Sequence, residues 1–116
     1  MATIKTIADL PVRTINAEGA RDCSARIIFG PRDHAPTFAL REFTLAPQGH
    51  TPYHQHSWEH EVVLLDHPLT LVSDTGDTTL LPGQAVLVPP GEMHRFRNDN
   101  PHPVRFLCLV PVEHQP

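Results

Sequence analysis

A short histidine-rich segment near the middle of the chain holds the residues best suited to do chemistry. It reads Tyr53-His-Gln-His-Ser-Trp-Glu-His-Glu61. Alternate side chains of an extended strand share a face, so His54 and His56 should project together and could chelate one metal ion. Either His60 or Glu61, which follow across a short turn, could complete such a site.

One further histidine, His94, stands directly after a turn that reads Pro89-Pro-Gly-Glu-Met93. If the strands that carry these histidines are neighbours, three or four ligands converge on one ion. Imidazole suits zinc, copper, iron and nickel, and mixed nitrogen and oxygen sites also hold manganese. An isolated histidine is usually only a polar surface residue, and we interpret the others in that way: His34, His50, His102 and His114.

The segments around these histidines predict β-structure. The chain has 13 prolines, and proline is excluded from helix interiors and central strands, so the elements must be short. No long stretch has the 3.6-residue apolar period of a helix. Short alternating runs end instead at glycine and proline turns, and residues 73–77 form a hairpin signal. We therefore expect a sandwich or small barrel. The runs are 25–29, 37–45 (ending at a turn over 47–49), 62–65, 69–72, 78–81, 85–88, 94–96 and 104–110.

Composition restricts the classes of protein that the chain can belong to. Its 116 residues suit one domain, and its net charge of −4 comes without the clustered basic patch of a nucleic-acid-binding protein. We find neither a signal-peptide pattern nor an apolar run long enough to cross a membrane, and we expect a cytoplasmic protein. Cys23 and Cys108 could form one bridge, but in the cytosol two reduced thiols are expected.

Two motifs of the chain resemble those of the cupin superfamily. The segment from Gly83 to Asn98 matches the second cupin motif, G(x)5PxG(x)2H(x)3N, at every fixed position, with His94 as its histidine. The histidines of the first motif, G(x)5HxH(x)3–4E(x)6G, fall on His54 and His56. The resemblance implies an all-β fold, the double-stranded β-helix or jelly-roll barrel.

The first motif departs from the cupin pattern at three positions. Its leading glycine falls on Gln48, its glutamate on His60, and its closing glycine on His67. Because glycine at such a turn often has positive φ, His67 implies a differently shaped hairpin or a solvent-exposed turn residue, and we do not expect it to be a ligand.

The segment from His54 to Glu61 is similar to the HxHxWEHE signature of small single-domain cupins. This resemblance implies that four histidines hold one divalent ion, with Glu61 as the fallback ligand in place of His60. It implies manganese first, while cupin sites also accept iron, copper, nickel and zinc. The four implied ligands are His54, His56, His60 and His94.

Three further residues are candidates for the wall of a substrate pocket. Phe106 and Cys108 alternate on the last predicted strand and so share a face, which could point into the barrel. Arg41 interrupts an apolar strand; if it points inward, it could orient an anionic substrate or an oxygen species. Trp58 is expected to pack as a lid or against a partner subunit.

Several activities are compatible with these residues. A divalent ion on neutral nitrogens can act as a Lewis acid or a redox centre, and the cupin resemblance favours a dioxygenase acting on a small molecule. The alternatives are a metal-dependent isomerase or lyase, which would need a general base near the substrate, and a non-catalytic small-molecule-binding cupin.

The beginning of the chain has weak strand character. We predict an N-terminal arm over residues 1–20 and a cupin barrel over residues 21–116. The arm carries apolar residues with little core of their own, so we expect it to pair with a second subunit in a homodimer, because sheet edges need covering.

Overall fold

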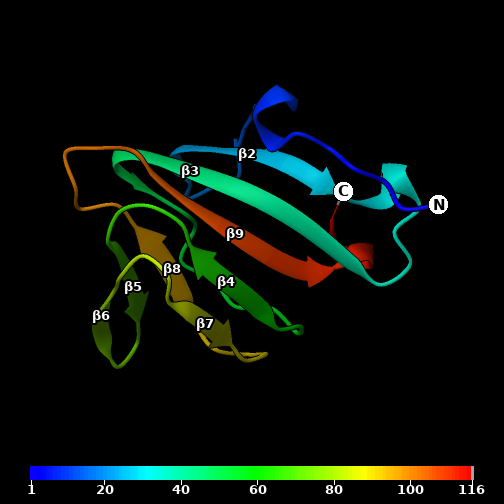
Figure 1. Ribbon diagram of the computed structural model, residues 1–116. Coiled ribbons are helices and arrows are strands. Elements are labelled where there is room, and N and C mark those ends of the chain that lie inside the picture. Colours follow the sequence, from blue (N-terminus) through cyan, green and yellow to red (C-terminus); the bar gives the residue numbers. More distant parts are fainter. Residues whose placement is uncertain (116) are drawn as a thin grey trace.

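Nine strands form one antiparallel sheet that curls on itself in the computed structural model, which describes residues 1–115 (Figure 1). No helix within these residues is long and apolar enough to cross a membrane. The all-β, jelly-roll prediction is confirmed. The strands are β1 Arg13–Thr14, β2 Arg21–Phe29, β3 Phe38–His50, β4 His60–Leu64, β5 Leu69–Ser73, β6 Gly76–Leu80, β7 Ala85–Val88, β8 His94–Arg97 and β9 Val104–Pro111. Short 3-10 helices are η1 Ile7–Asp9, η2 Pro31–Asp33 and η3 Val112–His114.

The sheet brings together strands that lie far apart in the sequence. Its order is β6-β5-β8-β3-β9-β4-β7, with β2 also paired to β3 and β1 to β2. The long strands β2, β3 and β9 run side by side in Figure 1, and the shorter strands β4, β5, β7 and β8 lie beneath them. The start of β8 is thereby placed beside the loop that follows β3, which carries the paired histidines.

Each of the eight predicted runs falls on a strand, with residues 37, 65 and 81 just outside, but β3 is longer than predicted. We expected it to end at the turn over residues 47–49, whereas it continues to His50. Beyond Leu45 the strand leaves β9 and pairs with the β8 side, where the Gln48 amide donates to Asn98 (3.0 Å) and the Asn98 amide donates to Gly49 (2.9 Å). Pro47 lacks an amide hydrogen and still fits, because the strand changes partners at this point.

The left-handed backbone at this bend explains the glycine of the first cupin motif. Gln48 has a φ of 66°, a conformation that glycine adopts without strain. The next residue, Gly49, also needs its small size, since a Cβ there would lie 2.7 Å from the carbonyl oxygen of Asp22. His67, at the closing glycine position of that motif, is absent from the positive-φ positions of the described chain, so its turn does not use the backbone conformation that favours glycine.

The N-terminal arm lies against β2 of the same chain. Arg13 in β1 is opposite Ala25, and Lys5 Nζ donates to the Ile28 carbonyl (2.7 Å) and to Asp33 Oδ1 (2.6 Å). The arm contributes the two-residue strand β1 to the sheet, and the first long strand, β2, begins at Arg21. Pairing of the arm with a second subunit, and the homodimer itself, stay predictions.

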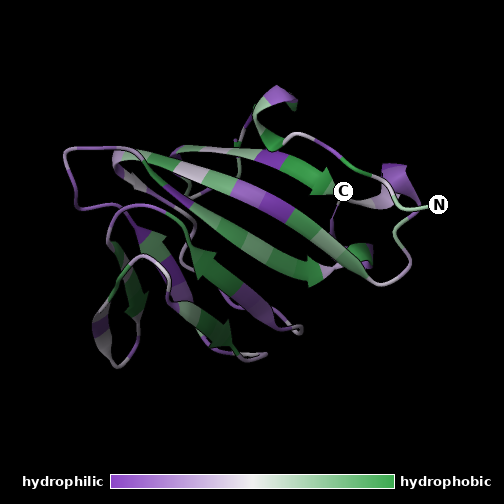
Figure 2. Cartoon of the chain, viewed as in Figure 1, coloured by the Kyte–Doolittle hydropathy of each residue, from purple (hydrophilic) through white to green (hydrophobic). Residues whose placement is uncertain are grey.

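The core lies on the inner face of the sheet. Along β9, Val104, Phe106, Cys108 and Val110 are buried, and the residues between them are more exposed. Figure 2 shows this strand as apolar over most of its length. Since Phe106 and Cys108 share the buried face, the alternation that was predicted from the sequence is present in the structure.

Asn98, the last fixed residue of the second motif, is a fully buried polar junction. Its Nδ2 donates to the carbonyls of Leu45 (3.0 Å) and His102 (2.7 Å), and its Oδ1 accepts from the backbone of Asn100 (2.8 Å). One side chain thus joins β3, at Leu45, to the segment between β8 and β9, and holds the end of β8 against the bend in β3.

We predict that Asn98→Ala lowers the free energy of unfolding by about 2–3 kcal/mol, because buried carbonyls lose their donors. The exposed Asn16→Ala should change it by less than about 0.5 kcal/mol. Urea unfolding followed by circular dichroism measures both, and equal effects of the two substitutions would contradict this role for Asn98.

Candidate metal centre

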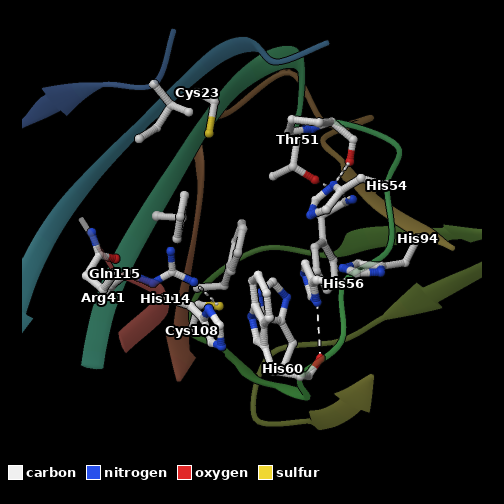
Figure 3. Close-up of a pocket in the computed structure, with 16 residues that line it drawn as sticks. Cys23, Arg41, Thr51, His54, His56, His60, His94, Cys108, His114 and Gln115 are labelled. Atoms are coloured by element: carbon white, nitrogen blue, oxygen red, sulfur yellow. Dashed lines mark hydrogen bonds between the residues drawn. The ribbon is translucent and has the colours of Figure 1, made fainter. Parts of the chain in front are cut away.

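Three of the predicted ligands lie together at one end of the barrel (Figure 3). A reciprocal pair of backbone hydrogen bonds, of 3.1 and 3.0 Å, joins His54 to His94 at the start of β8. The ring of His56 is 4.9 Å from that of His54 and 5.2 Å from that of His94, centroid to centroid. One ligand atom from each of the three residues lies within 4.8 Å of the others, so this group could hold a metal ion.

The backbone fixes the protonation of these three imidazoles. Each Nδ1 contacts a carbonyl oxygen, which can only accept a hydrogen bond, so each Nδ1 carries the proton and each Nε2 keeps a lone pair. The Nε2 atoms of His56 and His94 are buried without a hydrogen-bond partner in the described chain. Such a donor set fits a metal ion. The Nδ1 contacts are His54 to Pro52 (2.6 Å), His56 to Trp58 (3.1 Å) and His94 to Glu92 (2.9 Å).

Electrostatics also favour the form that binds metal. Burial lowers the pKa of His56 and of His94 from their ordinary values. The same cause lowers the pKa of His60 to about 2. All three rings are therefore neutral near pH 7, and a neutral imidazole has a lone pair available for a metal without first losing a proton.

His60 and Glu61 lie on opposite faces of β4. His60 faces the cluster, its ring centroid 4.3 Å from that of His56, and its Nδ1 is buried without a hydrogen-bond partner in residues 1–115. It lies outside the closely spaced group of three ligand atoms, so its role as fourth ligand stays a prediction. Glu61 is exposed and lines shallow hollows on the outer side of the sheet.

The histidines open into a cavity of about 290 Å³, and the three candidate wall residues, Arg41, Phe106 and Cys108, all line it. Cys23 lines it too, and both cysteines are buried free thiols. Burial raises the pKa of Cys23 to about 12 and raises that of Cys108, so neither thiol is ionised near pH 7. None of the 16 residues that line the cavity is acidic.

Sequence reasoning missed the contribution of the C-terminal segment to this cavity. We interpreted His114 as a surface residue, and it is exposed. What we missed is that η3 also brings it to the cavity, where its ring stacks on Trp58 at 3.6 Å. Trp58 in turn stacks on His56 at 4.5 Å. His114 follows the last predicted strand, so no alternating sequence pattern could have predicted that its side chain reaches the cavity. Other lining residues that were not predicted are Ile15, Phe43, Thr51, Pro52, Phe96 and Gln115.

The remaining histidine of interest, His67, lies away from the cavity. Its ring stacks on that of His102, with centroids 4.9 Å apart, and it does not line the histidine site. This agrees with its interpretation as a turn residue.

A histidine cluster that could hold a metal ion, inside a curled jelly-roll sheet, is typical of the cupin class, and comparison with known proteins gives the same class. Residues 41–110 match the cupin domain family, and the chain belongs to this family. No curated protein matches the chain.

Solved structures give a closer similarity. The polyketide cyclase RemF from Streptomyces resistomycificus is 34% identical, with a TM-score of 0.92, over 100% of this chain and 83% of that one. The cupin-2 domain protein Rru_A2000 from Rhodospirillum rubrum is 21% identical, with a TM-score of 0.83, over 100% and 78%. A predicted oxalate decarboxylase from Thermotoga maritima is 17% identical, with a TM-score of 0.83, over 95% and 99%. The last two similarities concern the fold alone.

The first prediction for this site concerns its ligands. His56→Ala and His94→Ala should remove metal binding, well beyond the roughly 10–100-fold effect of losing a supporting group. His60→Ala should weaken binding sharply if His60 is the fourth ligand. Titration of the metal-free protein with a divalent ion, followed by calorimetry, measures each affinity.

Glu61→Ala is the matched control, because this neighbour of His60 is exposed on the other face of β4. Its affinity should equal that of the unsubstituted protein. A larger loss with Glu61→Ala than with His60→Ala would return the site to three histidines and a glutamate.

The second prediction concerns pH. The unfolded chain protonates its histidines near pH 6.5, whereas buried His60 stays neutral until about pH 2. Stability of the metal-free protein should therefore fall as the pH drops from about 6.5 to 4.5, above the range where carboxylates titrate. His60→Gln should reduce this slope in denaturant unfolding measured across that range. An unchanged slope would show that His60 is not held neutral.

Proposed function

We propose that the protein is a metal-dependent cyclase that closes a ring in a polyketide-type substrate, a chain with ketones on alternate carbons. The observation that carries the proposal is a histidine cluster opening into an apolar cavity with aromatic walls and without an acidic side chain. The 34% identity to a polyketide cyclase across the whole chain supports the same reaction class.

The walls of the cavity suit a flat, unsaturated product. The rings of Phe43 and Phe106 stack at 5.5 Å, and the ring of Phe96 lies 5.3 Å from that of Phe106. Apolar aromatic surfaces bury the carbon chain, exclude water and favour folded conformers that bring distant carbons together. A cavity of about 290 Å³ is close to the lower end of the range for small-molecule sites.

The chemistry divides between the ion and the side chains. A divalent ion held by His54, His56 and His94, with His60 as the proposed fourth ligand, would act as a Lewis acid toward a dicarbonyl group. The base must be an imidazole, because the cavity lacks a carboxylate. We assign this role to His114, which lines the cavity outside the cluster. It accepts a proton from the carbon between two carbonyls, and that carbon bonds to a distant ketone carbon as the π bond of this ketone breaks toward its oxygen. His114 returns the proton to that oxygen, and the resulting hydroxyl leaves as water with a proton from the adjacent carbon.

The identity of the ion belongs to the same proposal. The resemblance to small manganese cupins supports manganese, and an all-imidazole donor set supports zinc, iron, nickel or copper. Elemental analysis of protein purified without added metal distinguishes them.

The dioxygenase favoured by the sequence is our second candidate. A donor set of imidazoles suits iron and copper, both of which can react with oxygen. The two candidates differ in their need for oxygen, since ring closure with loss of water consumes no oxidant.

We predict that the metal-loaded protein converts a linear triketone acid to a cyclised, dehydrated product under anaerobic conditions. His114→Phe keeps a ring against Trp58 and should slow the reaction by about 10²–10⁴-fold, the usual contribution of a general base, without loss of metal. Mass spectrometry of the product and elemental analysis of the variant measure both effects.

His56→Ala serves as the metal-deficient control and should fall to the rate without enzyme. Oxygen uptake in step with substrate loss, and no reaction without oxygen, would replace the cyclase with the dioxygenase. Saturable substrate binding without turnover in either atmosphere would indicate a binding protein.

A further inference from the structure

Arg41 lies on the inner face of β3, in the wall of the cavity. Figure 3 shows it beside Cys108, on the side of the cavity away from His54, His56 and His94. Its Nη2 donates to Cys108 Sγ at 3.0 Å, and its guanidinium carbon lies 4.8 Å from the centre of the Phe43 ring. Its Nε is buried and makes no hydrogen bond within residues 1–115.

No acidic partner meets this guanidinium within the described chain. Several other arginines of residues 1–115 pair with carboxylates: Arg26 with Glu42, Arg97 with Asp77 and Asp99, and Arg105 with Asp66. Arg13, Arg32 and Arg95 do not, but none of these three lines the cavity. Arg41 takes part in none of the ion pairs of this region. Arg41 is half-buried, with its Nε fully buried. Even partial removal of a charge from water is costly without a partner, so proteins usually pair such charges.

The neighbouring side chains do not neutralise Arg41 either. Cys23 and Cys108 are protonated near pH 7, because burial raises the pKa of both thiols. None of the 16 lining residues is an aspartate or glutamate. The cavity therefore presents one fixed positive charge on apolar walls, opposite the histidines that would hold a second cation.

We propose that Arg41 binds a carboxylate of the substrate and so selects keto acids over neutral ketones or esters. The choice of a keto acid as the ligand rests on the proposed function. The expectation that the ligand is negatively charged rests on the geometry of the cavity. The planar guanidinium can match a carboxylate through two parallel hydrogen bonds, and within residues 1–115 its Nη groups make one hydrogen bond, to Cys108, which leaves further N–H donors for a ligand. Binding there fixes one end of the chain on β3 and leaves its ketones toward the histidines.

This arrangement makes Arg41 a positioning residue with a role in specificity. A chain held at its acid end can place only ketones at a set distance from that end beside the histidine cluster. The carbon that reacts, and hence the size of the ring, would then depend on the distance from the carboxylate.

A matched pair of probes tests the proposal directly: 3,5-dioxohexanoate and its methyl ester. Both present the same dicarbonyl, and only the acid carries a negative charge. The metal-loaded protein should bind the acid at least about tenfold more tightly, as measured by calorimetry. The metal-free protein should keep this preference, because an ion on the histidines is then not available to bind the carboxylate.

Arg41→Met retains the apolar stem of the side chain and should abolish the preference, with ester affinity changed by less than about threefold. Arg41→Lys retains the charge and should keep part of the preference. Arg32→Gln, at an exposed arginine outside the cavity, should behave as the unsubstituted protein does. Thermal unfolding establishes that each variant is folded. If Arg41→Met does not fold, the affinities of the unsubstituted protein and of Arg41→Lys for the acid and the ester still test whether Arg41 selects the carboxylate.

Equal binding of acid and ester by the unsubstituted protein, or a preference that survives in Arg41→Met, would overturn the proposal. The result of this binding experiment can be distinguished from the result of the cyclisation experiment. Cyclisation without a preference for the acid would leave the function standing and remove the role of Arg41. A preference without cyclisation would leave a carboxylate site in a protein with another activity.

Discussion

The backbone bridge between His54 and His94 is the contact on which the site depends. Its two hydrogen bonds join a loop after β3 to the first residue of β8, segments that are distant in sequence. Without this bridge the paired histidines would lie on a free loop, and loss of loop freedom would oppose metal binding. The jelly-roll topology provides the bridge because β8 pairs with both β3 and β5. The second motif, which ends at buried Asn98, holds the other end of β8 in place.

The cavity has a polar side, which carries the histidines, and an apolar side, which carries Arg41, and the fold must provide both. The histidines need a polar backbone at their Nδ1 atoms, which the loops at the barrel mouth supply through carbonyls. The opposite wall is apolar, and within residues 1–115 it carries Arg41 with a thiol and an aromatic ring as its close partners. Residues that stabilise the barrel thus also form the floor of the site, as Phe106 does from β9.

Much of this arrangement could be predicted from the sequence. Alternation placed His54 and His56 on one face, and in the structure the same alternation of half-buried and exposed residues continues through Trp58 to His60. The ends of strands were harder to predict. Strand β3 continues past the predicted turn because it changes its pairing partner after Leu45, and the local sequence does not encode that change. The second role of His114 was missed for a similar reason: the residue is exposed as predicted, but its place at the cavity follows from where β9 ends in space. The choice between His60 and Glu61 needed the register of β4, which pairing with β7 and β9 determines.

Trp58 is the only tryptophan of the chain, and its ring lies between those of His56 and His114. Indole fluorescence depends on what touches the ring, so the emission of this protein reports on one place alone. An ion on the imidazole of His56 would alter the stacked face of the indole, and a paramagnetic ion such as manganese or copper would quench emission in a way that zinc would not. The molecule thus carries its own optical probe at the mouth of the cavity.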